Sequence, residues 1–245
     1  MWNRKANGLI LTFHLAGINN QNFLMRDDQT GTFWQQISGK AVSGPLAGSQ
    51  LTLVYSDELT FDLWRKLEPG GSVLLPVPGF VPDYETKDWE EHMAKARTVL
   101  DFPNTPLKSR DLVLGIQLAG ESRAYSVSRI LDATLIEDRL GGEPLLIVTG
   151  PDRRSIRAFR TRLDDGETVS EFYRKPDPGQ GPNPVAVADA KVPLFLDTKT
   201  ASEWNFDGCA VSGKSSGRCL TPVSAVKDYW FDWRNYHPDT GIFKR

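Results

Sequence analysis

Acidic, hydroxyl and tryptophan side chains recur at one spacing in two distant parts of this 245-residue chain. The pattern D-x-x-T-x-[ST]-x-W runs from Asp27 to Trp34 and again from Asp197 to Trp204. Such an aspartate could take part in catalysis or bind a ligand, and an exposed indole ring could stack on a sugar. The same pattern fits a structural role, in which the aspartate caps a turn and the tryptophan enters the core. We favour turn and core, and we keep ligand binding by Asp27, Asp197, Trp34 and Trp204 as the alternative.

The chain has three histidines, and two of them are further candidates for ligand binding. His14 follows an apolar segment and has several asparagines nearby, and His237 lies in the sequence Y-H-P-D. His92 falls on the apolar stripe of an expected helix, so we expect it to pack. The histidines have no zinc-site spacing, and the chain lacks G-x-S-x-G, P-loop and G-x-G-x-x-G motifs. The sequence therefore predicts no metal site or cofactor and assigns no catalytic residue, although a Ser–His–acid triad could still assemble in space.

Two cysteines, Cys209 and Cys219, flank a glycine- and serine-rich segment that is typical of a hairpin turn. Residues on opposing strands of a hairpin come close to the separation that a disulfide needs. A disulfide would indicate an oxidising compartment, whereas two free thiols would fit a reducing one. Both alternatives stay open at this point.

The candidate residues belong to two copies of one unit. Residues 38–69 align without a gap to residues 207–238, at an offset of 169, and 12 of these 32 positions are identical. A repeat of this length indicates one structural unit present twice. We therefore expect 27–69 and 197–238 to share one fold, related by an approximate two-fold axis.

The fold that must position these residues is expected to be mainly β with a few short helices, in two internally repeated β-rich lobes. The first lobe is incomplete, because it lacks a counterpart of residues 107–158. Short helices are expected within 57–67 and 226–236, ended by prolines and burying Trp64 and Trp233. The domain boundaries are then 1–73 for the first repeat, 74–106 for a proline-rich linker with one helix at 86–100, and 107–245 for the second repeat. Strands are expected at 8–15, at 49–56, and near 111–118, 122–127, 132–139 and 144–149.

Composition narrows the classes of partner. The net charge is −2 and 40% of residues are hydrophobic, which is ordinary for a globular protein and gives no footprint for nucleic acid. No apolar run approaches the roughly 18–20 residues of a membrane span, and the first residues lack the pattern of a signal peptide. An apolar edge at Leu9 to Phe13 makes a homo-oligomer a further alternative, because an uncovered edge would favour pairing with a second chain.

Three segments resemble an uncharacterised bacterial family, domain of unknown function 3179. They are FLMRDDQTGTFWQQISGKAVSGPLAGSQL, then RDLVLGIQLAGESRAYSVSRI with EDRLGGEPLLIV, and DYWFDWRNYHPDTGIF. Members of that family usually carry C-P-x-C after the strand that matches Leu145 to Val148, where this chain reads TGPDRR. In the first copy the matching place would lie before Met1, so the first repeat is interpreted as truncated at its N-terminal side. The resemblance implies an envelope-associated protein in a periplasmic or extracellular location.

These observations predict a ligand- or partner-binding protein whose ligand is an unknown small molecule or glycan. The alternative is a hydrolase with its active site in the groove between the two repeats. A thiol redox role is disfavoured because the C-P-x-C motif is absent.

Overall fold

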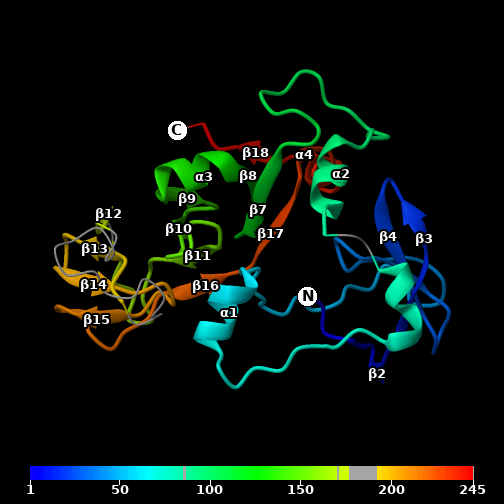
Figure 1. Cartoon of the computed structure of the whole chain (residues 1–245), viewed down its shortest axis with the longest axis horizontal. Coiled ribbons are helices and arrows are strands. Elements are labelled where there is room, and N and C mark those ends of the chain that lie inside the picture. The colour runs from blue at the N-terminus through cyan, green and yellow to red at the C-terminus, as the bar shows by residue number, and fades with distance from the viewer. Residues whose placement is uncertain (85–86, 170, 177–191, 245) are drawn as a thin grey trace.

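The computed structural model describes residues 1–84, 87–169, 171–176 and 192–244 (Figure 1). The fold is mainly β, with 38% of residues in strands and 14% in helices, as the sequence predicted. Small sheets, nearly all antiparallel, follow one another across the molecule. In Figure 1, the N-terminal sheet lies at one end, a C-terminal sheet lies at the other, and two sheets lie between them.

The N-terminal sheet has the strand order β3-β4-β5-β6 and is preceded by a short β1–β2 hairpin. Its strands are β1 (Lys5–Ala6), β2 (Leu9–Ile10), β3 (Phe13–Asn19), β4 (Asn22–Asp27), β5 (Phe33–Gln35) and β6 (Ala41–Ser43). The single strand expected at 8–15 is wrong, because strand pairing is interrupted between Ile10 and Phe13. The Leu11 side chain in this interruption is buried with Trp34 and Leu51. The strand expected at 49–56 is also wrong. Only isolated bridges form there, at Gln50 and Leu53.

The middle of the molecule contains two four-stranded sheets, with orders β17-β7-β8-β18 and β16-β11-β10-β9. The four strands expected between 111 and 149 are confirmed as β7 (Leu112–Leu118), β8 (Glu121–Ser126), β9 (Leu135–Leu140) and β10 (Glu143–Thr149). The remaining strands of these sheets are β11 (Ile156–Arg160), β16 (Thr221–Val223), β17 (Ala225–Tyr229) and β18 (Gly241–Ile242). A helix that the sequence analysis missed, α3 (Val127–Ala133), joins β8 to β9 and ends at Thr134 in the left-handed conformation.

The C-terminal sheet repeats the strand order of the N-terminal one, as β12-β13-β14-β15. Its strands are β12 (Phe172–Arg174), β13 (Phe195–Asp197), β14 (Ser202–Trp204) and β15 (Ala210–Ser212). Trp204, Phe172 and Phe195 pack there with Phe159 and Leu146 of the neighbouring sheet β16-β11-β10-β9. The main core is therefore shared between sheets.

The expected helices within 57–67 and 226–236 are confirmed over shorter ranges. They are α1 (Phe61–Leu67) and α4 (Trp230–Tyr236), and each ends two residues before a proline. Trp233 is buried, as predicted, but Trp64 is only half-buried. The prediction of a core tryptophan is therefore confirmed for Trp233 and wrong for Trp64.

The helix expected at 86–100 is shorter in the structure, where it is α2 (Trp89–Lys95). The 3-10 helix η1 (Pro78–Asp83) precedes it. None of the α2 side chains is buried, so the expected packing of His92 is wrong. An apolar stripe stabilises a helix only where another surface covers it, and too little of the described chain lies over α2 to bury any of its side chains. No helix among the described residues is long and apolar enough to cross a membrane.

Candidate functional site

The repeated aspartate–tryptophan motif forms two closed hydrogen-bond networks. Asp27 accepts hydrogen bonds from the Thr30 amide at 2.5 Å and from the Trp34 indole at 2.9 Å. Asp197 accepts the corresponding bonds from Thr200 at 2.6 Å and from Trp204 at 2.8 Å. Burial raises the pKa of Asp27, but the indole and threonine donors outweigh burial and leave this pKa below its usual value.

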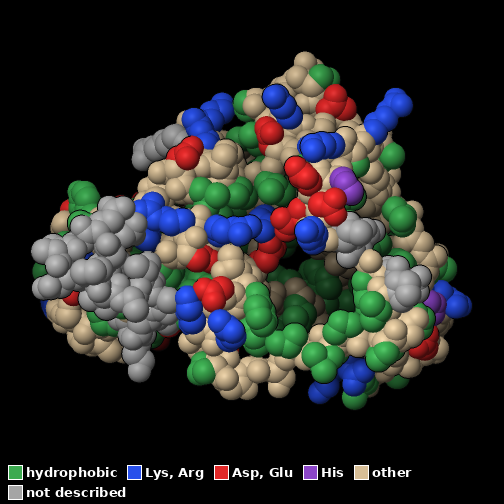
Figure 2. Space-filling model, in the orientation of Figure 1, with side chains coloured by type: hydrophobic (Ala, Val, Ile, Leu, Met, Phe, Trp, Pro, Cys, Tyr) green, Lys and Arg blue, Asp and Glu red, His purple; other side chains and the backbone are tan. Residues whose placement is uncertain are grey.

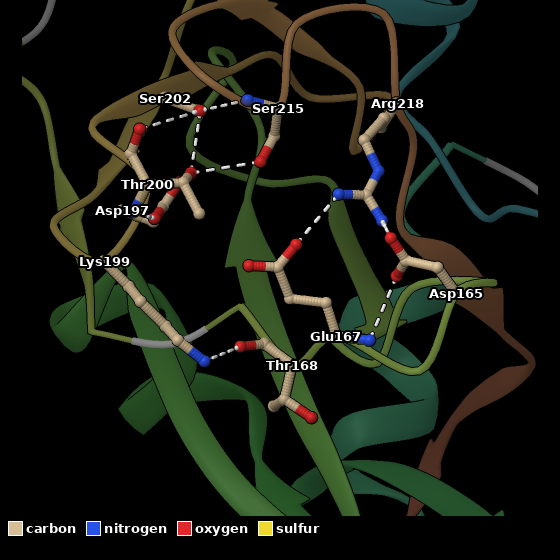
Figure 3. A network of polar contacts seen from close by, with 9 residues as sticks. All are labelled: Asp165, Glu167, Thr168, Asp197, Lys199, Thr200, Ser202, Ser215 and Arg218. Atoms are coloured by element: carbon tan, nitrogen blue, oxygen red, sulfur yellow. Dashed lines mark hydrogen bonds and ion pairs between the residues drawn. The ribbon is translucent and has the colours of Figure 1, made fainter.

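Both networks lie in the interior. Figure 3 shows the second one, in which Thr200, Ser202 and Ser215 continue the chain of hydrogen bonds from Asp197. Trp34, Trp204 and both aspartates have no exposed surface. The turn and core interpretation is confirmed, and ligand stacking on the two indole rings finds no support because neither ring reaches the surface.

The two cysteines form a disulfide, with a Cα–Cα distance of 4.0 Å. The backbones of Cys209 and Cys219 also form an isolated antiparallel β-bridge. Lys40 and Gln50 form the same kind of β-bridge at the corresponding places of the first copy. A covalent link therefore replaces a polar pair at one of two matching hairpins. On the same hairpin, Arg218 pairs with Asp165 and Glu167 (Figure 3). These contacts have a structural role and leave no reactive thiol among the described residues.

The strongest candidate for a functional site is a cavity of about 340 Å³ between the N-terminal sheet and the sheet β17-β7-β8-β18, which we call the central sheet. In Figure 2 the surface is hollowed between these two parts, and apolar side chains line the hollow. Apolar walls come from Trp2, Ile37, Leu53, Val54 and Trp233. Polar groups come from Asn22, Gln36, Gln117, Asp228 and His237. Apolar walls with a few convergent polar groups are typical of small-molecule sites, and the volume falls within their range of roughly 300–1,000 Å³.

A pair of interacting carboxyl groups lies at one side of this cavity. Asp228 is the fourth residue of β17, and Asp232 lies in the first turn of α4. Burial and the neighbouring charge of Asp232 raise the pKa of Asp228 to about 8, and burial also raises the pKa of Asp232. At neutral pH the pair of carboxyl groups therefore holds one proton.

The β3–β4 hairpin contacts this pair of carboxyl groups and the end of α4. The Asn22 amide donates to Asp232 at 2.9 Å, and the Tyr236 hydroxyl donates to the Asn19 carbonyl at 2.9 Å. One oxygen of Asn22 and one of Asp232 are buried without a hydrogen-bond partner in the described part of the chain. The proton held by the carboxyl pair can serve the Asp232 oxygen, whereas the Asn22 oxygen remains a buried acceptor without a donor. Such an acceptor is costly, so a donor from a ligand or water would stabilise this place.

His237 contributes a neutral imidazole to the same cavity. Its ring stacks on Trp233 with centroids 3.7 Å apart, and its Nδ1 lies 3.1 Å from the Trp233 carbonyl. A carbonyl only accepts, so Nδ1 carries the proton and Nε2 keeps its lone pair. Burial lowers the pKa of His237, which favours the neutral form.

The structure therefore separates the residues that the sequence singled out. His237 lines the cavity, whereas His14 lies on the exposed face of β3 with Nδ1 2.7 Å from Asp28. Sequence reasoning missed Asn22, Asp228 and Asp232. The available signal was a carboxylate at each end of the aromatic run DYWFD, because charged groups among aromatic residues indicate burial. Among the described residues, no group of three or more His, Cys, Asp or Glu side chains could hold a metal ion.

Comparison with known protein families identifies this chain. A family described as "Protein of unknown function (DUF3179)" matches residues 1–240. No curated protein and no solved structure matches the chain.

Proposed function

The chain belongs to the DUF3179 family of proteins of unknown function, and from its own geometry we propose that it binds a small, uncharged, hydroxylated molecule such as a short glycan. The proposed site is the cavity between the N-terminal and central sheets. The observation that carries the proposal is the meeting of Asn22, Asp228 and His237 on apolar walls. The Asp228 carboxyl and the neutral His237 imidazole offer hydrogen bonds on apolar walls, and Lys227 on the same cavity is already paired with Glu58. These groups suit the hydroxyl groups of a sugar.

We interpret the molecule as two related lobes with this cavity at their junction. Three structural correspondences support that interpretation. Helices α1 and α4 have the same length at an offset of 169, and their C-caps have nearly the same φ and ψ, −123° and 66° against −129° and 68°. Glu58 forms an ion pair with Lys227, its own counterpart at that offset, as residues next to a two-fold axis would do.

We extend the proposal to an envelope location, periplasmic or extracellular. The Cys209–Cys219 disulfide supports it, because disulfides persist in oxidising compartments. A binding protein of the envelope would encounter glycans there.

Saturation-transfer NMR with a panel of neutral mono- and disaccharides tests the binding proposal. We expect transfer from the wild-type protein, and we expect Asp228→Asn to keep it because an amide can donate where the protonated carboxyl does. Asp228→Leu should abolish transfer, since leucine fills the same place without a donor. His14→Ala, on exposed β3, is the control and should bind as the wild type does. Equal transfer to Asp228→Leu, or none to the wild type, would contradict the proposal.

A hydrolase with its active site in this cavity is a second proposal, supported by an acid and a base that line the same cavity. Asp228 is protonated near neutral pH, and His237 is a neutral imidazole with a free Nε2, so the two could act as general acid and general base. Nitrophenyl glycosides and esters are suitable substrates for the test. We expect His237→Gln to remove turnover while ligand binding persists. Binding without any turnover by the wild type would decide against the hydrolase alone.

A further inference from the structure

In the second copy, one helix is covered by a four-stranded sheet. Trp230 and Trp233 of α4 are 1% and 2% exposed and pack against Val113 of β7 and Ala124 of β8. Strand β7 pairs with β17 before the helix, and β8 pairs with β18 after it. The fit is close at Gly115 of β7, where an added Cβ would lie 2.3 Å from the Trp233 ring.

The first copy contains the helix and both outer segments of that sheet, without the central hairpin. At the offset of 169, β17 corresponds to residues 56–60, α4 to α1, and β18 to residues 72–73. Helix α1 follows 56–60 as α4 follows β17, and Gly71 donates its amide to the Glu68 carbonyl as Thr240 does to His237. Among the described strands of residues 1–73, none takes the place of β7 and β8 beside α1.

The surfaces that the hairpin covers in the second copy are exposed in the first. Phe61, at the place of Trp230, is 61% exposed, and Trp64, at the place of Trp233, is half-buried. Val73 and Leu74, at the places of Ile242 and Phe243, are 54% and 97% exposed. Apolar side chains this exposed and this close together mark an interaction surface.

The backbone edges on both sides of this surface are unpaired. Within the described part of the chain, residues 56–59 and 72–74 take part in no strand and no backbone hydrogen bond. A cavity of about 720 Å³ lies between them, and its apolar lining includes Leu59, Phe61, Trp64 and Leu74. The charged side chains that also line it are Asp57, Glu68, Arg157 and Asp207, of which Arg157 forms ion pairs with the two aspartates. Unpaired edges beside exposed apolar side chains are the arrangement that accepts an added strand.

We propose that this groove binds a β-hairpin of a partner polypeptide, which pairs with residues 56–59 on one side and residues 72–73 on the other. With the hairpin bound, α1 is covered by the same strand order that covers α4. The hairpin then lies over Phe61 and Trp64. Its chemistry follows from β7 and β8, so it carries apolar residues on the face toward α1 and a glycine opposite Trp64. This site is separate from the small-molecule cavity, and it stands whether or not that cavity binds a sugar.

The probe is a synthetic peptide of residues 111–127, labelled with a fluorophore, whose binding to the intact protein is followed by fluorescence polarisation. We expect saturable binding that a scrambled peptide of the same composition does not show. Phe61→Ser should weaken binding about tenfold or more, because it removes exposed apolar contact area. Val73→Pro should also weaken it by removing an edge N–H. Leu75→Ser is the matched control, since Leu75 is 76% exposed and does not line the groove.

Hydrogen exchange locates the bound peptide. The amides of residues 56–59 and 72–74 should become protected when the peptide is added. Protection elsewhere, equal binding by Phe61→Ser, or no binding by the wild type would overturn the proposal. Self-association through this groove without peptide binding would also overturn it, because the occupant would then be a second copy of the chain.

Discussion

Replacing Asp228 with asparagine should stabilise the protein at alkaline pH and should leave it nearly unchanged in acid. In the folded protein the pKa of Asp228 rises from 3.8 to about 8, because burial and the charge of Asp232 disfavour a second carboxylate. Between these two values the unfolded chain has released a proton that the folded chain still holds. The free energy of unfolding therefore falls as pH rises through this window, and it becomes constant above it.

The size of this effect follows from the same values. A rise from 3.8 to about 8, at about 1.4 kcal/mol per pH unit, sets a ceiling on the order of 6 kcal/mol at pH 8. Asp228 is half-buried and shares its proton with Asp232, so we expect a smaller gain of about 2–4 kcal/mol for Asp228→Asn. The amide replaces the protonated carboxyl with little change, because its oxygen can still accept from the Tyr229 amide.

Urea unfolding at several values between pH 4 and pH 9 measures the effect. As pH rises, the free energy of unfolding of the wild type should fall relative to that of Asp228→Asn. The two curves of unfolding free energy against pH should meet near pH 4. Asp239→Asn, an exposed aspartate beyond α4, is the matched control and should run parallel to the wild type. Parallel curves for wild type and Asp228→Asn would refute the reasoning, because Asp228 would then have an ordinary pKa.

Three further predictions concern stability. Trp204→Phe should cost about 1–3 kcal/mol in urea unfolding, because the buried Asp197 carboxylate loses its 2.8 Å indole donor; an unchanged midpoint would contradict this. Reducing the Cys209–Cys219 disulfide, which spans a sequence separation of 10, should cost about 2–3 kcal/mol. Calorimetry with and without reductant checks this, and equal Tm values would exclude it. Trp233→Ala should cost about 3–5 kcal/mol because the side chain is only 2% exposed. Trp64→Ala should cost clearly less, so similar losses in thermal melts would show that the two sites are equally buried.

Much of the local structure could be predicted from the sequence. The spacing of Asp27 and Trp34 predicted a capped turn leading into a buried indole ring, and that is what forms, because partners seven residues apart are joined by one turn. The strands between 111 and 149 and the ends of α1 and α4 before prolines were predicted for similar reasons. Each depends on backbone preferences and on contacts between near neighbours in the chain.

Local patterns failed where burial depended on distant parts of the chain. Helix α2 has the stripe of a packed helix, yet it leaves Trp89 44% exposed. Trp64 and Trp233 occupy the same place in the repeat, and they differ in burial because β7 and β8 cover only the second. Neither difference is encoded within the segment itself.

The candidate site is the clearest product of tertiary structure. The sequence by itself determined the β-rich class, the duplicated motif and the closeness of two cysteines across a turn, because these depend on residues close together in the chain. Only the folded chain decided that Asn22 meets Asp232 across 210 positions. The same packing raises the pKa of Asp228 beside it and places His237 on the same cavity. A carboxyl group acquires an unusual pKa from the solvent it loses and the charges that reach it, and long-range packing sets both.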